Sequence, residues 1–265
     1  MKQYLDFLKT VLEEGVLTED RTGTGTISTF GQKMVFDLKE GLPVVTTKKI
    51  HLHSVIHELL WMFVLGSNDV SYLQENGVRI WNEWTDEKNT IGKGYGYQFR
   101  GWEGSNGERI DQVERLIHDL RNNPYSRRHI ITAWNVAQLD DMRLPPCHMM
   151  TQWYVRNGEL SCQLYQRSGD LFLGVPFNIT FYAILTHMLA HVTGLGVGKL
   201  HHVIGDAHIY VNHLEQVQLQ LTREPHPLPK LWLNPEVQHF DDFTYDDIRV
   251  LDYQHHPPIK GKVSV

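Results

Sequence analysis

The sequence contains little cysteine and no segment with the features of a secretion signal. Only two cysteines occur among 265 residues, which is too few for a disulfide framework. The first residues, MKQYLDFLKTVLEEG, are amphipathic and have neither an apolar core segment nor a small-residue cleavage site. We therefore expect reduced thiols and a cytoplasmic location.

The sequence also lacks an excess of basic charge and a long apolar run. Lys and Arg number 25 against 31 Asp and Glu, a formal net charge of −6. Proteins that coat nucleic acid or anionic membranes carry a basic excess, and no apolar run approaches the roughly 20 residues of a membrane span. We expect neither a nucleic acid nor a membrane as partner. A small anionic ligand needs only a few placed arginines.

Metal-binding motifs are missing although the chain has sixteen histidines. A zinc site formed by His201, His202, His208 and His213 is disfavoured because no Cys-x-x-Cys or His-Glu-x-x-His spacing accompanies them. We expect no metal.

The apolar pattern predicts one domain over residues 1–265, because no linker, repeat or low-complexity segment interrupts it. Helices are expected near residues 1–14, 52–65, 110–121, 175–193 and 211–223. Asn157-Gly158 predicts a hairpin between two strands. Since this order is not a regular βαβ alternation, the fold class should be α+β.

The stretch RLPPCHMM contains Cys147 directly after two prolines, each of which fixes its own φ. Taken alone, this cysteine is best interpreted as a small buried hydrophobe. The alternative is a nucleophile held in a rigid turn, activated by neighbouring arginines.

Three groups of cations could bind an anion. Arg21 lies in the glycine-rich loop at residues 20–26, and Arg127-Arg128 begin a predicted strand. Side chains of consecutive strand residues point to opposite faces, so that both arginines could contact one ligand only from a loop or a partner chain. The third group, in the segment YQRSGD at residues 165–170, combines an arginine, a hydroxyl and a carboxylate at a strand end.

Polar groups in apolar surroundings complete the candidates. Asn178 lies inside an apolar helix, too far along it for a cap, and its amide can both donate and accept. His208 and Tyr210 share one face of a strand and suit a ribose. Glu58 lies in an apolar helix, where burial should raise its pKa toward that of a general acid. Each motif alone also has a structural interpretation, but together they predict an enzyme that attacks a nucleotide monophosphate through Cys147.

Many of these segments resemble thymidylate synthases. The resemblance runs from Asp20 to the last residue, with the segments in family order and spacing. They are DRTGTGT, HELLW, IWNEW, SRRHI, LPPCH, QLYQRSGD, FLGVPFNI, GDAHIYVNH and HPPIKGKVSV.

The resemblance implies that 5,10-methylenetetrahydrofolate, as cosubstrate, methylates dUMP to dTMP and leaves as dihydrofolate. It also implies an obligate homodimer built on a large kinked mixed sheet flanked by helices, with Arg127 and Arg128 donated across the interface. By analogy, Cys147 adds to C6 of the pyrimidine, and Glu58 and Tyr95 assist proton transfer. The implied catalytic residues are Cys147, Glu58, Tyr95, Asn178 and Asp170.

The resemblance further assigns binding residues. Those implied for dUMP are Arg21, Arg127, Arg128, Arg167, Ser168, Gly169, Asp170, Asn178, His208 and Tyr210. Those implied for folate are Lys48, His51, Trp81, Trp84, Asp170, Leu173, Gly174, Phe177 and Ser264. The terminal residues 263–265 would close over the bound pair.

The sequence departs from the family pattern before Tyr95, where Gly92-Lys93-Gly94 replaces the usual Gly-Pro-Val. Two rival functions follow. A hydroxymethylase on the same scaffold is disfavoured by Trp81, which would hold the folate for hydride transfer. A non-catalytic nucleotide- or RNA-binding relative is disfavoured because Cys147, Glu58 and the arginines are all present. Asn178, rather than aspartate, favours uracil over cytosine.

Overall fold

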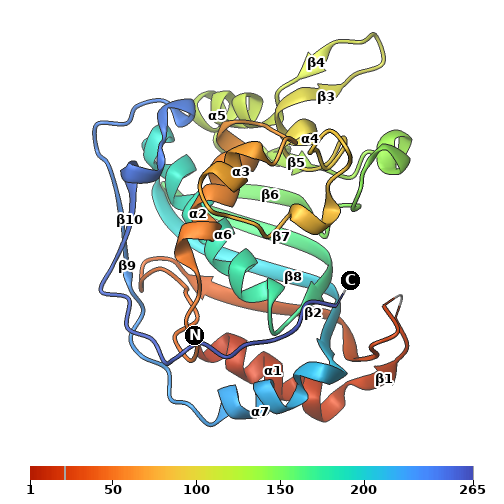
Figure 1. The fold of residues 1–265 in the computed structure, drawn as a ribbon. Coiled ribbons are helices and arrows are strands. Elements are labelled where there is room, and N and C mark those ends of the chain that lie inside the picture. The colour runs from red at the N-terminus through yellow and green to blue at the C-terminus, as the bar shows by residue number, and fades with distance from the viewer. Residues whose placement is uncertain (21, 265) are drawn as a thin grey trace.

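The fold is seen in a computed structural model, which describes residues 1–20 and 22–264. Its centre is a six-stranded sheet with strand order β1-β2-β8-β7-β6-β5 (Figure 1). Only β7 and β8 pair in parallel and the other neighbours are antiparallel, so the sheet is mixed. The strands of this sheet are β1 (Val16–Thr18), β2 (Thr26–Asp37), β5 (Ile130–Thr132), β6 (His148–Arg156), β7 (Glu159–Asp170) and β8 (Gly196–Tyr210).

Helices and two small hairpins surround this sheet, which confirms the α+β fold class. The α-helices are α1 (Lys2–Glu14), α2 (Leu52–Leu59), α3 (Ser71–Glu75), α4 (Gly96–Gly101), α5 (Gln112–Asn122), α6 (Gly174–Thr193) and α7 (Leu214–Leu221). The hairpins pair β3 (Trp102–Glu103) with β4 (Arg109–Ile110) and β9 (Lys230–Leu233) with β10 (Ile248–Leu251).

The core lies between the sheet and α6, the longest helix, which packs on β7 and β8 (Figure 1). This helix is apolar on nearly all sides because neighbouring helices cover the side turned away from the sheet. With 20 residues and a mean hydropathy of 1.2, it is long and apolar enough to cross a membrane. The expectation that no apolar run approaches this length was therefore wrong. Since 78% of the tested window is buried, α6 has the environment of a core helix.

Local signals fix several element boundaries, and the hairpin turn and the end of α6 lie where they were predicted. Asp111 precedes α5, and its carboxylate accepts hydrogen bonds from the backbone N–H groups of Val113 and Glu114. Asn157 and Gly158 connect β6 to β7 with φ of 52° and 74°, the left-handed pair of a tight hairpin turn. Gly194 ends α6 with φ of 71°.

Two expected elements differ. The helix predicted over residues 52–65 is α-helical only to Leu59 and continues as a π-helix, Leu60–Val64. The pair Arg127-Arg128 lies in the loop before β5 and does not begin a strand. The objection based on alternating strand faces therefore does not apply to these two arginines.

Candidate active site

Cys147 directly precedes β6, whose first residue, His148, pairs with Gln166 of β7. This pairing places the cysteine beside Arg167, whose backbone N–H donates to the Cys147 carbonyl over 2.8 Å. The Arg167 guanidinium donates from Nε to the Pro146 carbonyl (2.9 Å) and from Nη2 to that of Pro145 (2.8 Å). One arginine thus fixes the turn that the two prolines begin.

The same guanidinium reaches the thiol, with Nη2 lying 3.7 Å from Cys147 Sγ. Burial nevertheless raises the pKa of the Cys147 thiol, and the positive charge of Arg167 opposes this only in part. The expected activation, a thiol pKa lowered by neighbouring arginines, is therefore not seen among the residues that the structure describes in this single chain. Arg167 Nη1 donates to none of the described residues, which leaves it available to an anion.

Tyr95 connects Cys147 to an aromatic wall, which consists of the rings of Tyr95, Trp81 and His148. Its hydroxyl oxygen accepts a hydrogen bond from the Cys147 backbone N–H over 2.9 Å. Its ring centroid lies 5.4 Å from that of Trp81 and 4.4 Å from that of His148. Complete burial raises the Tyr95 pKa well above its usual value, so the hydroxyl stays protonated.

Glu58 of α2 is buried behind this wall. Its Oε1 accepts a hydrogen bond from Trp81 Nε1 over 2.7 Å. Loss of hydration raises the pKa of the carboxyl to about 7, while the Trp81 hydrogen bond acts in the opposite direction. A buried acid with a pKa near neutrality can both donate and accept a proton, as the apolar helix around it predicted.

The ends of β7 and β8 place three of the predicted binding residues side by side. Asp170 pairs with His208, and the His208 carbonyl accepts from the Leu171 backbone N–H over 2.9 Å. The rings of His208 and Tyr210 lie 5.1 Å apart and nearly perpendicular. The expected shared strand face is therefore present beside the carboxylate.

Gly169 lies between these residues and Arg167, in tight packing. A Cβ on Gly169 would lie 2.9 Å from Val175 and 3.1 Å from Ile204, so that only glycine fits without a shift of its neighbours. Its neighbour Ser168 accepts through its carbonyl from the Gln166 side chain over 3.0 Å.

The first turns of α6 contribute Asn178 and a half-buried apolar surface. Asn178 Oδ1 accepts from Gln166 Nε2 over 3.1 Å. Leu173, Gly174 and Phe177 are half-buried at the same end of the helix. A Cβ on Gly174 would meet only Asp170, at 4.0 Å, so the space beside this glycine is open.

Asp170 and Lys48 hold the loop that leads into α6. Asp170 Oδ1 accepts from the backbone N–H groups of Phe172 and Leu173 over 2.9 and 3.2 Å, while Oδ2 receives no hydrogen bond from a described residue. The Lys48 ammonium donates to the Phe172 carbonyl. Burial lowers the pKa of Lys48 to about 7, and the Asp170 charge opposes this. In this state Lys48 faces the protein interior, where it does not reach a tail in solvent.

The remaining folate candidates lie on neighbouring elements. The Trp84 ring lies 5.9 Å from that of Trp81. His51 precedes α2, is exposed, and bonds through Nδ1 to Ser54 Oγ over 2.8 Å. The paired Trp81 and Trp84 rings offer aromatic surface, and Asp170 offers a carboxylate oxygen that no described residue bonds, which are the groups that a flat, N–H-bearing heterocycle needs.

Some predicted residues are not joined to the site. Arg127 and Arg128 are exposed, and their side chains make no hydrogen bond or ion pair within the described residues. Arg21 and Val265 lie outside the described residues. Ser264 lies near Thr24, with hydroxyl oxygens 3.3 Å apart, so the tail reaches the loop that contains Arg21.

A sequence model of the family described as thymidylate synthase matches residues 2–265, essentially the whole chain. The chain belongs to this family. Thymidylate synthases methylate dUMP and use a folate cosubstrate, which makes this chain an enzyme of the methyltransferase type. Among the residues that the structure describes, no group of three or more His, Cys, Asp or Glu side chains could hold a metal ion.

Two buried side chains of this thymidylate synthase site were missed. His148 bonds through Nδ1 to the Tyr182 hydroxyl over 2.7 Å and packs against Tyr95. Gln166 bonds to Asn178 and to Ser168. Each adjoins a predicted residue, Cys147 or Arg167, and strand pairing across β6 and β7 was the signal that could have found them.

The loop before Tyr95 is held by contacts that replace the stiffness of the usual Pro-Val pair. The Lys93 backbone N–H donates to the Asp141 carbonyl over 3.0 Å, and the Lys93 carbonyl accepts from Gln98 over 2.9 Å. Tyr95 has a φ of 33°, which is unusual for a residue with a side chain. The loop thus holds a strained backbone at a residue that contacts Cys147.

Gly92 is the point in this loop where a side chain cannot fit. Its φ is 71°, and a Cβ would lie 2.1 Å from the Asp141 carbonyl oxygen. Gly92→Ala should lower the free energy of unfolding by about 2–4 kcal/mol and lower kcat by displacing Tyr95. Urea unfolding and initial rates test this. Gly107→Ala is the matched control, because its φ is 77° but its Cβ would meet open space; equal losses in both variants would contradict the steric argument.

Proposed function

We propose that this protein transfers the one-carbon unit of 5,10-methylenetetrahydrofolate to C5 of dUMP and reduces it, giving dTMP and dihydrofolate. The observation that carries the proposal is the connected set of Cys147, Tyr95, Trp81 and Glu58. In this set a half-buried thiol, a buried protonated hydroxyl and a buried acid with a pKa near 7 are joined by successive contacts. A nucleophile and a proton carrier of this kind are what addition to a pyrimidine requires.

The chemistry begins at Cys147. Its sulfur loses the thiol proton and forms a bond to C6 of the pyrimidine, and the electron pair of the C5–C6 double bond makes C5 nucleophilic. The folate supplies both the one-carbon unit and the hydride that reduces it. Glu58 exchanges protons with the ring. Once the one-carbon unit is bonded to C5, C5 loses its proton and the carbon–nitrogen bond to the folate breaks, which leaves an exocyclic methylene. Hydride from the folate adds to this methylene, the C5–C6 double bond re-forms, and the cysteine sulfur leaves as a thiolate.

Other residues bind and orient the substrates. The free Nη1 of Arg167 supports a role in holding the phosphate, together with Ser168, the next residue along β7. Arg21, which lies outside the described residues, is proposed for the same role on the family resemblance alone. His208 and Tyr210 suit the ribose, and the Asn178 amide suits the edge of the uracil ring. Asp170 Oδ2 and the Trp81–Trp84 wall suit the folate ring. The tail near Ser264 would exclude water once the pair is bound.

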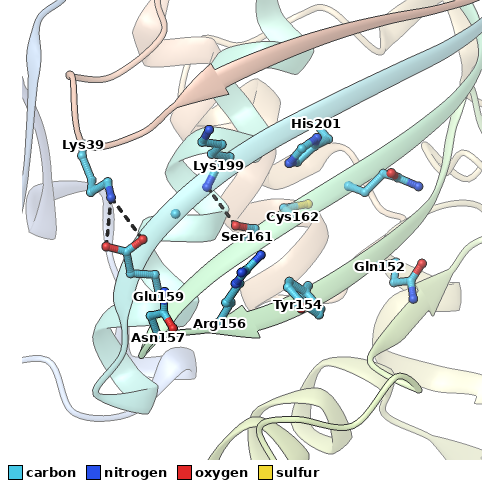
Figure 2. A pocket seen from close by; sticks show the side chains of 12 residues that line it. Lys39, Gln152, Tyr154, Arg156, Asn157, Glu159, Ser161, Cys162, Lys199 and His201 are labelled. Carbon is cyan, nitrogen blue, oxygen red and sulfur yellow. Dashed lines mark hydrogen bonds and ion pairs between the residues drawn. The ribbon is translucent and has the colours of Figure 1, made fainter.

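We also propose a homodimer, which would form in the reducing environment of the cytoplasm. The sheet face turned away from α6 carries long side chains from β6, β7 and β8, including Tyr154, Arg156 and His201, around a hollow (Figure 2). Tyr154 is 55% exposed. A second copy packed on this face would cover it and bring its own Arg127 and Arg128 loop toward the first copy's phosphate site.

Shared sites make a specific prediction for mixed dimers. Cys147→Ser and the double variant Arg127→Ala/Arg128→Ala should each lose most activity as homodimers. Co-refolding equal amounts should restore about one quarter of wild-type activity, because half of the dimers are mixed and each has one intact site. Steady-state rates measure the restored activity, and sedimentation analysis measures the fraction of protein that is dimeric. Each variant refolded alone is the control, and an inactive mixture of folded dimers would exclude sharing of these arginines.

The activity itself is tested by incubating the protein with dUMP and 5,10-methylenetetrahydrofolate. Dihydrofolate absorbance and the mass of the nucleotide are followed together. A methylated nucleotide formed in step with dihydrofolate is the expected result. A hydroxymethylated nucleotide with tetrahydrofolate would instead support the hydroxymethylase, and binding of dUMP without turnover would support the non-catalytic relative.

A further inference from the structure

The buried residue His202 is connected through Gln166 to Asn178, the amide proposed to bind the pyrimidine. His202 of β8 is fully buried, and its Nε2 lies 2.8 Å from Gln166 Oε1. Its other ring nitrogen, Nδ1, has no hydrogen-bond partner among the described residues. Its neighbour His201 points to the opposite face of the sheet, toward the hollow (Figure 2). Within the described part of the chain His202 therefore makes one polar contact, to Gln166, and Gln166 in turn bonds to Asn178 of the candidate site.

The direction of each hydrogen bond follows from Gln166. Its Nε2 lies 3.0 Å from the Ser168 carbonyl, which can only accept, so this end of the amide must be the NH2 group. Gln166 Oε1 must then face His202 and accept from it. The ring is consequently the Nε2–H tautomer. Burial lowers the pKa of His202 to about 3, so the ring stays neutral and has a single N–H to donate.

The orientation of the Gln166 amide determines that of the Asn178 amide. The second N–H of Gln166 Nε2 donates to Asn178 Oδ1 over 3.1 Å. Asn178 must therefore turn its oxygen toward Gln166 and its Nδ2 away. Among the described residues nothing accepts from that Nδ2, and the side chain is half-buried at the first turns of α6. One arrangement of donors and acceptors thus extends over three side chains.

We infer that His202 is a positioning residue for base discrimination, acting through Gln166 to fix the orientation of the Asn178 amide. The inference rests on the proposed function. An amide with fixed ends donates from Nδ2 to the O4 oxygen of uracil and accepts at Oδ1 from N3–H. Cytosine presents an NH2 group and a bare nitrogen in these places, so it mismatches both ends. An amide that can flip would match either base.

The test compares binding of dUMP and dCMP, each without folate, by titration calorimetry. His202→Leu removes the donor but keeps an apolar side chain, so the preference for dUMP should fall about tenfold or more. His202→Gln places an N–H where Nε2 lies and should restore the preference to within about threefold. His187→Leu is the matched control, because His187 is another histidine largely removed from solvent, its Nε2 has no partner among the described residues, and the preference should not change.

The possible outcomes distinguish a failure of the proposed function from a failure of the role of His202. No preference for dUMP in the unaltered protein would overturn the proposed function. A preference that survives in folded His202→Leu would overturn only the role of His202. Equal losses in His202→Leu and His202→Gln would show that the ring acts by packing alone, and would also overturn it.

If a variant does not fold, a measurement on the unaltered protein tests whether His202 is the donor to Gln166. Nitrogen-15 NMR of the His202 ring should show a protonated Nε2 and a bare Nδ1 from pH 5 to pH 9. The Nδ1–H tautomer, or a doubly protonated ring in this range, would remove the donor arrangement and the inference with it.

Discussion

Cys147→Ser should lower kcat by about a thousandfold or more, because a serine hydroxyl is a far weaker nucleophile than a thiol. Among the described residues only the Arg167 guanidinium bonds to the side chain at this position, so no base there would take the hydroxyl proton. The turn itself should survive, since Arg167 and Tyr95 bond to backbone atoms of the Pro-Pro-Cys segment and do not depend on the sulfur. Initial rates of dihydrofolate formation give the loss. Mass spectrometry of the denatured reaction mixture should show a nucleotide adduct on the unaltered chain and none on the variant.

Cys162→Ala is the control for loss of a thiol. Cys162 lies in β7, fully buried, and burial raises its pKa far above the usual value, so it cannot react at neutral pH. Its removal should leave the rate within about twofold of the wild type and lower stability by about 1–2 kcal/mol through a small cavity. Turnover by Cys147→Ser at the wild-type rate would exclude Cys147 as the nucleophile.

Glu58→Gln should lower kcat by about 100-fold or more, because the amide cannot exchange protons. The unaltered protein should also show an inflection in log kcat against pH near 7, which reports ionisation of the buried carboxyl and should be absent from the variant. Gln can still accept the hydrogen bond from Trp81 Nε1. A pH profile of kcat for both proteins measures the effect, and an identical inflection in both would assign it to another group.

The same substitution should make the protein more stable at high pH. The Glu58 pKa is about 7 in the folded protein against 4.5 for an exposed group. Below pH 4.5 the carboxyl is neutral in both states and has no effect. Between pH 4.5 and 7 the unfolded chain ionises first, so stability falls as pH rises, by about 3 kcal/mol in all at 1.36 kcal/mol per pKa unit.

Glu58→Gln removes this loss. Its free energy of unfolding should exceed that of the wild type by up to about 3 kcal/mol at pH 8 and equal it near pH 4.5, in urea titrations at the two values. A gain of the same size at both values would show that the substitution acts on packing and not on the charge. The expected pattern is that of a site in which activity costs stability.

The local sequence was enough to predict most elements of the fold. The caps at Asp111 and Gly194 and the hairpin at Asn157-Gly158 depend on a few adjacent residues, whose preferred backbone angles act over short distances. The change from α- to π-helix at Leu60 was not predicted, because an extra residue in a turn leaves the apolar pattern almost unaltered.

The residue types and spacing also identified the family, and with it Cys147 and Glu58. Only the tertiary structure decided how these groups behave. The pKa of Glu58 depends on burial and on Trp81, and that of Cys147 on burial and on Arg167. Both are set by neighbours far away along the chain. His202 was singled out only as a failed zinc ligand, since its role appears when β7 and β8 pair and bring Gln166 against it. Hydrogen bonds between side chains on neighbouring strands depend on the register of those strands, which cannot be read from a single sequence.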